Sequence, residues 1–301
     1  MAKNESIEID LVMEGPDIVA LGLVALINQS ASKCNYNLDK LSIVGLRNVI
    51  QPKSNITICQ PEFPFYFAEN TRNKMKWVEK NIQYTFGCFI GRSNLHRLFL
   101  SSYLFKNYAD KTLQTFHYNK QDDFQSANVS VTELINYYGP EVCVDATKFL
   151  THCPMTLDQQ LTYPILMDQH CNLQDSYNKF FLEIVCETYF TGTTFFPTEK
   201  IWRAVATGTP FIVQGPKNFL SRLQRLGFET FQDFWPESYT LDFADNQATD
   251  LVKIIDWLGI KSLEEIQDMY QSMLPILKHN YNRFQELSDD DIKIFVESEQ
   301  E

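Results

Sequence analysis

The segment from Phe180 to Gly215 constrains the fold of this chain more than any other part of its sequence. It opens with a mostly apolar run, Phe180 to Cys186, which only Glu183 interrupts, and such a run is typical of a largely buried strand. Thr198 then offers an N-cap for a helix that ends at Gly208, and a second apolar run follows. This order predicts a strand, a loop, a helix and a second strand parallel to the first, as in α/β folds.

Polar side chains of this segment gather where its loop meets its helix. Glu187 closes the first strand, and Glu199 and Lys200 occupy the first turn of the helix. Parallel sheets bind their ligands at this carboxyl edge. The helix N-terminus attracts phosphate through its free N–H groups and its dipole, and Lys200 adds a cation. Because carboxylates accept hydrogen bonds from hydroxyl groups, the combination favours a sugar nucleotide as the ligand.

The same residues resemble a motif of the fucosyltransferase type of glycosyltransferase. Members of that family have a strand that ends in Glu, a short loop, and Thr-Glu-Lys at the start of a helix that ends before a small residue, Pro and a strand. The matching residues here are Glu187, Thr198-Glu199-Lys200, Gly208-Thr209-Pro210 and Gly215. The chain departs from the family at Thr188, where the family usually has Asn, and its loop is slightly longer.

The resemblance implies a GT-B fold, in which two Rossmann-like α/β domains face each other across a cleft and a kinked helix commonly ends the chain. It also implies a nucleotide-sugar donor, with a GDP-linked sugar favoured. In this family the lysine contacts the donor diphosphate and the glutamates hold the donor's sugars. These roles pass to Lys200, Glu187 and Glu199, with Thr198 opening the helix that carries two of them.

A second unit of strand, helix and strand precedes the first, at Tyr84–Ile90, Leu95–Tyr108 and Thr112–Phe116. Arg97 lies in the first turn of its helix, and the resemblance implies that it clamps the diphosphate, although Arg92 competes for this role. The alternative is that the Arg97 side chain only lies along its own helix. Tyr118 follows this unit and can stack on a nucleotide base or pack into the core.

We expect three parts of the chain: a reduced N-terminal α/β domain over 1–82, a nucleotide-sugar-binding domain over 83–287, and an acidic, frayed tail over 288–301. The first part is predicted to contain strands at 6–14, 41–46, 56–59 and 63–68 and helices at 18–28 and 72–80. A capping box at Ser262 and Glu265 opens a long helix to about Leu287, which Pro275 is expected to kink. A last short strand is expected at 227–231.

Charge and composition argue against several classes of protein. The formal net charge of −12 disfavours nucleic acid or an anionic membrane as a partner. The longest apolar run near the start is too short to span a bilayer, and the first residues lack the layout of a signal peptide. The seven cysteines include no Cys-x-x-Cys pair, which favours reduced thiols in a cytoplasmic protein. No His or Cys cluster has the spacing of zinc ligands, so no metal is expected.

Glycosyl transfer with inversion needs a base that takes the proton of the acceptor hydroxyl. In GT-B enzymes this base usually comes from the N-terminal domain, so the candidates are Glu14, Asp17 and Glu69. Glu14 is favoured because it lies at the carboxyl end of the first expected strand. We therefore expect a metal-independent, inverting glycosyltransferase that needs no cofactor and moves a sugar onto a glycan or another hydroxyl acceptor. Lys200 and Arg97 would neutralise the leaving diphosphate.

Two other functions stay open at this point. The first is an enzyme that glycosylates a modified base in DNA from the same donor site, and the net charge counts against it. The second is a non-catalytic sugar-nucleotide-binding or scaffold protein that kept the fold and lost the base, which the small N-terminal domain favours. A basic face in the structure would favour the first, and a cleft without an acid near the donor site would favour the second.

Overall fold

The computed structural model describes residues 7–11, 23–37, 41–45, 57–59, 66–91, 93–118, 131–157, 171–188, 195–241, 244–288, 290–291 and 294–295. Its larger sheet has four strands: β4 (Tyr84–Ile90), β5 (Thr112–Phe116), β6 (Phe180–Cys186) and β7 (Phe211–Gln214). Their order is β5-β4-β6-β7, and all the pairs are parallel. The protein is therefore an α/β fold with one four-stranded, Rossmann-like parallel sheet.

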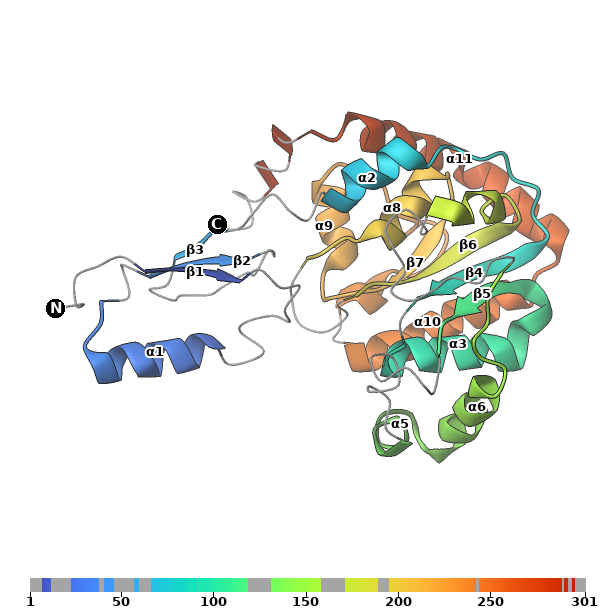
Figure 1. The fold of residues 1–301 in the computed structure, drawn as a ribbon. Helices are drawn as coiled ribbons and strands as arrows, with labels where there is room; N and C mark the ends of the chain where they lie inside the picture. The colour runs from blue at the N-terminus through green and yellow to red at the C-terminus, as the bar shows by residue number, and fades with distance from the viewer. Residues whose placement is uncertain are drawn as a thin grey trace.

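Helices cover both faces of this sheet (Figure 1). On one face α3 (Leu95–Tyr108) packs against β5, and α10 (Ala244–Gly259) packs against α3 and β7. On the other face α8 (Glu199–Ala206) contacts β6 and β7, and α11 (Leu263–Glu286) contacts β4 and β6. The helix α2 (Tyr66–Lys74) lies over α8 and α11. This two-sided cover explains why β6 is apolar at every position except Glu183.

The remaining described elements of this unit are short. The helices α5 (Val131–Tyr138) and α6 (Pro140–Leu150) pack on α3 and on each other, and α9 (Phe219–Arg225) follows β7. Three 3-10 turns are η4 (Ala109–Lys111), η5 (Cys171–Ser176) and η6 (Ser238–Leu241). The helix α6 was not expected from the sequence, although Pro140 at its first turn is a typical helix start.

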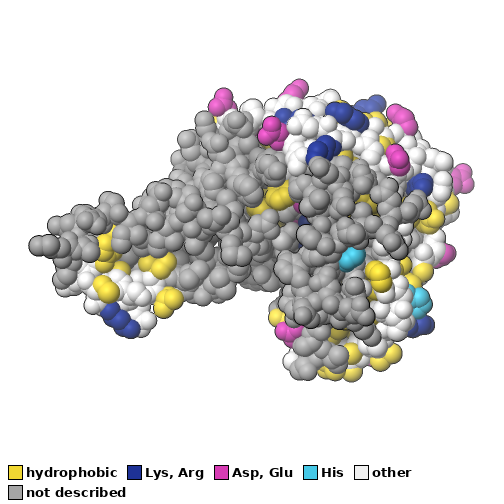
Figure 2. Space-filling view, in the orientation of Figure 1, with side chains coloured by type: hydrophobic (Ala, Val, Ile, Leu, Met, Phe, Trp, Pro, Cys, Tyr) yellow, Lys and Arg dark blue, Asp and Glu magenta, His cyan; other side chains and the backbone are white. Residues whose placement is uncertain are grey.

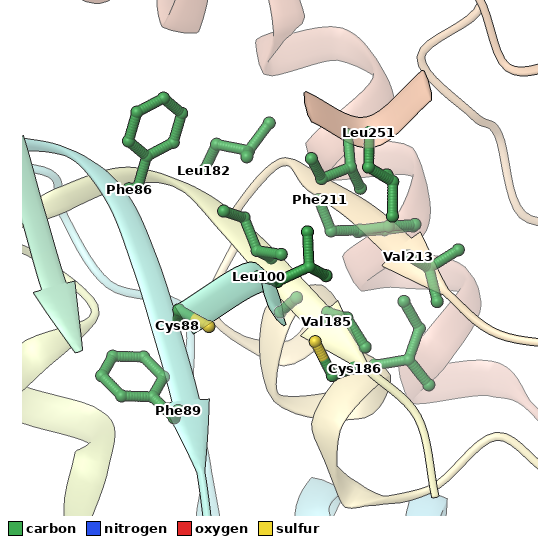
Figure 3. Packing of buried hydrophobic residues seen from close by; sticks show 14 of the residues in the cluster. Phe86, Cys88, Phe89, Leu100, Leu182, Val185, Cys186, Phe211, Val213 and Leu251 are labelled. Atoms are coloured by element: carbon green, nitrogen blue, oxygen red, sulfur yellow. The ribbon is translucent and has the colours of Figure 1, made fainter. Parts of the chain in front are cut away.

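The core of this unit lies between the sheet and its helices. Figure 3 shows side chains from β4, β6 and β7 gathered there together with Leu100 of α3 and Leu251 of α10. All seven residues of β6 are buried, including the carboxylate-bearing Glu183. Close packing at the sheet requires Gly87 on β4, where a Cβ atom would lie 2.6 Å from the ring of Phe180.

A second, smaller sheet lies to one side of the larger one in Figure 1. Its three strands, β1 (Ile7–Leu11), β2 (Leu41–Gly45) and β3 (Thr57–Cys59), are parallel and paired in chain order. The helix α1 (Leu23–Cys34) connects the first two in sequence. The described strands overlap those expected at 6–14, 41–46 and 56–59, whereas α1 extends to Cys34, beyond the end expected at residue 28. That two domains face each other across a cleft stays a prediction.

Two elements that we predicted before β4 are wrong. We expected a strand at 63–68 and a helix at 72–80, whereas α2 already spans Tyr66–Lys74 and residues 75–83 are not helical. Long-range bonds hold this segment: Asn81 and Gln83 donate backbone N–H groups to Asn178 O and Lys179 O, each at 2.7 Å. Tertiary contacts therefore outweigh the local helix propensity here.

The strand expected at 227–231 is also absent, because side chains bond the backbone groups that a strand ladder would use. Glu229 N donates to Asn280 Oδ1 at 2.7 Å, and Asn280 Nδ2 donates back to Glu229 O at 2.8 Å. Phe231 N donates to the Glu237 carboxylate at 2.8 Å. Gly227 has a φ of +89°, which turns the chain out of α9.

The end of the chain agrees with expectation in its helix and differs in its tail. The capping box of Ser262 and Glu265 opens α11 as predicted, and Pro275 lies inside the helix. The tail is not frayed throughout, because Phe295 is buried against Phe195. Within the described residues, no helix has both the length and the apolar character that a membrane crossing requires.

Candidate functional site

The candidate site is built where β6 ends and α8 begins. Thr198 is the N-cap of α8, as predicted, and its hydroxyl accepts from Lys200 N. The Glu187 carboxylate reaches back across the loop to the same residue: Oε1 accepts from Thr198 N at 3.1 Å and Oε2 from Thr198 Oγ1 at 2.5 Å. These bonds join the end of β6 to the start of α8 at the carboxyl edge of the sheet, where parallel α/β folds bind ligands.

Lys200 lies in the first turn of α8, and its ammonium group faces this edge. Its Nζ donates to Glu199 Oε1 at 2.9 Å, to Thr198 Oγ1 at 3.0 Å and to Thr188 Oγ1 at 3.2 Å. The side chain is 12% exposed. Its charge therefore lies beside the positive end of the α8 dipole and is paired with the Glu199 carboxylate.

Arg97 comes to the same place from the neighbouring strand–helix unit. Asn94 caps α3 by accepting from Arg97 N at 2.9 Å, so Arg97 lies in the first turn, as predicted. Its Nη2 donates to Cys186 O at 3.0 Å and to Glu187 O at 2.9 Å. The guanidinium is buried and holds the carboxyl end of β6. It does not simply lie along its own helix.

Burial dominates the electrostatics of Glu187. The side chain is 1% exposed, and this desolvation raises the pKa of its carboxyl group, while Lys200 and the bonds from Thr198 oppose the rise. Both oxygens already accept a hydrogen bond from Thr198. The geometry thus makes Glu187 the residue that fixes the N-cap of α8.

A buried polar network beneath the site was not predicted from the sequence. Arg203 of α8 lies 3.5 Å from Glu183 Oε1, and Tyr177 bridges them by donating to Glu183 Oε2 at 2.8 Å and accepting from Arg203 Nε at 3.0 Å. Burial raises the pKa of Glu183 to about 7, although Arg203 and Tyr177 oppose the shift. A carboxylate inside an apolar strand was the available signal, and Arg203 is one helical turn beyond Glu199.

Lys80 extends this network to the opposite end of β6. Its Nζ donates to Tyr177 O at 2.5 Å, to Thr209 Oγ1 at 2.6 Å and to Phe180 O at 3.2 Å. Burial lowers the pKa of Lys80 to about 7, and the nearby charge of Glu183 opposes this change. Lys80 therefore ties the irregular segment before β4 to the sheet.

The other predicted site residues that the structure describes make no hydrogen bond to Lys200. Tyr118, after β5, is half-buried and packs against the core. Glu69 is exposed on α2, while Glu14 and Asp17 lie outside the described residues. Among the residues that the structure describes, no group of three or more His, Cys, Asp or Glu side chains is arranged to hold a metal. On the face seen in Figure 2, acidic and basic side chains are interspersed over the described surface.

Removing the hydroxyl of Thr198 tests whether the N-cap and Glu187 form one unit. We expect Thr198→Ala to lower the free energy of unfolding by about 1–2 kcal/mol, because it removes the cap and one of the two bonds to Glu187. Thr198→Ser keeps the hydroxyl and should cost clearly less. Urea denaturation measures both changes, and equal losses in the two variants would contradict the role of the hydroxyl.

No protein-family model matches this chain, and no curated protein matches it either.

Proposed function

We propose that this protein transfers a sugar from a nucleotide-sugar donor to an acceptor hydroxyl, without a metal ion, at the carboxyl edge of the four-stranded sheet. The observation that carries the proposal is the ammonium group of Lys200 at the N-terminus of α8, held by Glu199 and Thr198. A helix N-terminus with an adjacent cation is a favourable place for the two negative charges of a diphosphate. The resemblance of these residues to the fucosyltransferase-type motif supports the same assignment.

The contacts around Lys200 indicate which site residues bind the donor and which hold the site in place. Lys200 binds the diphosphate and stabilises the charge that develops on it as it leaves. Glu199, whose carboxylate Oε1 orients Lys200, is the candidate for accepting a hydrogen bond from a donor hydroxyl. Glu187 and Arg97 are buried and hold the loop and the strand end in place, so that the cation and the helix N-terminus stay aligned.

The remaining roles follow the expectation from the sequence. Tyr118 is the candidate for stacking on the nucleotide base, and Glu14 is the candidate for the base that deprotonates the acceptor. A transfer assay with Glu14→Gln tests the second role by whether the rate falls while donor affinity is kept. We propose a GDP-linked sugar as the donor and a glycan as the acceptor on the resemblance alone.

A panel of sugar nucleotides tests the donor site directly. We expect one class among the GDP-, UDP-, ADP-, CMP- and dTDP-linked sugars to raise the melting temperature of the wild type, because a ligand that binds only the folded state stabilises it. Lys200→Ala should weaken binding by about 10- to 100-fold, which is the loss of one charge-assisted bond. The shift at a fixed ligand concentration should then largely disappear.

Lys253→Ala is the matched control for this experiment. Lys253 also pairs with a nearby acid, Asp250 at 2.7 Å, but it lies on α10 and is 72% exposed. We expect this variant to keep the full shift. A well-folded wild type that responds to no sugar nucleotide, or a response that Lys200→Ala leaves unchanged, would reject the donor site.

A non-catalytic sugar-nucleotide-binding protein is the second candidate. The hydrogen bonds that Glu187 and Glu199 already make within the protein favour it. Both oxygens of Glu187 accept bonds from Thr198, and Glu199 is bonded to Lys200, so these carboxylates serve the site's own structure. Release of nucleoside diphosphate in the presence of mixed glycan acceptors separates the two functions. Binding without any release would favour the non-catalytic protein, and release would favour the transferase.

A further inference from the structure

Each residue of the loop 195–198, which leads into α8, contacts a different part of the fold. Phe195 packs on Phe219 of α9, with ring centroids 5.1 Å apart, and Phe196 packs edge-on against Phe67 of α2 at 5.7 Å. The carbonyl of Pro197 accepts from Trp202 Nε1 at 3.2 Å. Thr198, the next residue, is the N-cap that Glu187 holds. The position of the N-cap therefore depends on how this short run is packed.

The segment after α11 supplies one more of these contacts. Phe295 lies with its ring centroid 5.4 Å from that of Phe195, and its side chain is 3% exposed. The guanidinium of Arg225 on α9 lies over the ring of Phe295 at 5.6 Å. Phe295 thus completes the apolar surroundings of Phe195, three residues before the N-cap of the candidate site.

Polar bonds hold Asp291, four residues before Phe295, against the end of α11. Arg283 Nη2 pairs with Asp291 Oδ1 at 2.9 Å, and Ser288 donates to Asp291 Oδ2 from its backbone N at 2.9 Å and from its hydroxyl at 2.7 Å. Arg283 and Ser288 lower the pKa of Asp291 to about 2. The ion pair between Arg283 and Asp291 is therefore charged at neutral pH.

We propose that Phe295 is a positioning residue of the donor site: by packing on Phe195 it fixes the loop 195–198, and through Thr198 it sets the affinity of Lys200 for a sugar nucleotide. This inference rests on the proposed function for its ligand. Its structural half, the coupling of Phe295 to the N-cap of α8, stands on the packing alone. Phe295 thereby supports the site even though it lies far from it in sequence.

Two variants at neighbouring positions test the proposal. Phe295→Ala removes the contact with Phe195, and Ile294→Ala is the matched control because Ile294 is 66% exposed. We expect Phe295→Ala to bind the sugar nucleotide at least about tenfold more weakly by calorimetry. The control should bind as the wild type does. Phe295→Leu, which keeps an apolar side chain, should restore most of the affinity.

Hydrogen exchange provides a second measurement that does not need the ligand. In Phe295→Ala the amides of residues 198–202 should exchange faster, while those of β4 keep their wild-type protection, because the opening is local. A uniform loss of protection would mean general destabilisation, and it would overturn the proposal. Asp291→Asn, which removes the charge that pairs with Arg283 and leaves Phe295 intact, should give a smaller change in the same amides.

The outcomes separate the inference from the function on which it rests. If the wild type binds a sugar nucleotide and Phe295→Ala binds it equally well, with unchanged exchange at 198–202, the positioning role is rejected and the donor site stands. If the wild type binds no sugar nucleotide but the exchange at 198–202 rises in Phe295→Ala, the proposed function is rejected and the coupling stands. Weaker binding together with faster local exchange supports both.

Discussion

Replacing Arg203 by methionine is expected to lower the free energy of unfolding by about 3–5 kcal/mol, because it leaves the buried Glu183 carboxylate without its charged partner. Methionine keeps most of the length of the side chain, so the loss reports mainly on charge and hydrogen bonding. Arg203 also binds the hydroxyl of Tyr177, which in turn donates to Glu183. Urea denaturation at pH 8 measures the change.

Two further variants show whether burial is the cause. The double variant Arg203→Met with Glu183→Gln removes both charges, and we expect it to be more stable than Arg203→Met alone. Lys106→Met breaks the surface pair with Asp145, which is shorter, at 2.7 Å against 3.5 Å, but has its lysine 55% exposed. That variant should lose no more than about 1 kcal/mol. If the losses from Arg203→Met and Lys106→Met were equal, the buried network would not stabilise the fold.

The cost of Arg203→Met should also depend on pH. Burial raises the pKa of Glu183 to about 7, and the loss of Arg203 should raise it further. Above pH 7 the folded variant then keeps a proton that the folded wild type has released, while Glu183 is ionised in both unfolded chains. The folded variant is disfavoured by that difference at high pH, so its loss of stability should be larger at pH 8 than at pH 6.

Gly208→Ala is the second substitution with a large expected effect, a loss of about 2–5 kcal/mol. The residue ends α8 with a φ of +63°, where a side chain costs about 1–2 kcal/mol. A Cβ atom would also lie 2.4 Å from the ring of Trp77, and overpacking of this kind costs about 1–3 kcal/mol. The ring packs edge-on against Tyr281 of α11 at 5.6 Å, so moving it away would disturb this contact.

Two other glycines separate these contributions. Gly139 has a φ of +84°, and a Cβ atom added there would meet nothing within 4 Å, so Gly139→Ala should show the backbone cost alone. Gly87 has no positive φ, but its Cβ would overlap the ring of Phe180, so Gly87→Ala should show the overlap alone. Denaturant unfolding of the three variants provides the comparison. If Gly208→Ala lost no more than Gly139→Ala, Trp77 would have to be free to shift.

The sequence predicted the two strand–helix–strand units of the larger sheet because their signals are local. The boundaries of β4, α3 and β5 follow from apolar runs, the Asn94 cap and the pattern of the helix. The start of α8 follows from Thr198, and its end from Gly208. Each of these signals acts within a few residues of the element that it defines.

Long-range bonds account for what the sequence did not reveal. Residues 75–83 are not a helix because Lys80 bonds groups on β6 and beside β7, and 227–231 is not a strand because Asn280 of α11 takes its backbone groups. At the site, the Thr198 cap could be predicted, but the bonds from Arg97 to the end of β6 depend on the pairing of β4 with β6. Such pairings have no local signature.

The contact between α2 and the end of α11 affects the order in which the sheet is covered during synthesis. Arg72 of α2 donates to Leu287 O at 2.9 Å and lies over the ring of Phe284, so the outer cover of α8 joins residues from opposite ends of this unit. A ribosome that has completed β7 has made all four strands but neither α10, which packs on β7, nor α11, which packs on β4 and β6. Both faces of the nascent sheet are incompletely covered at that stage, and we expect the face under α11 to expose apolar surface until synthesis has passed Leu287.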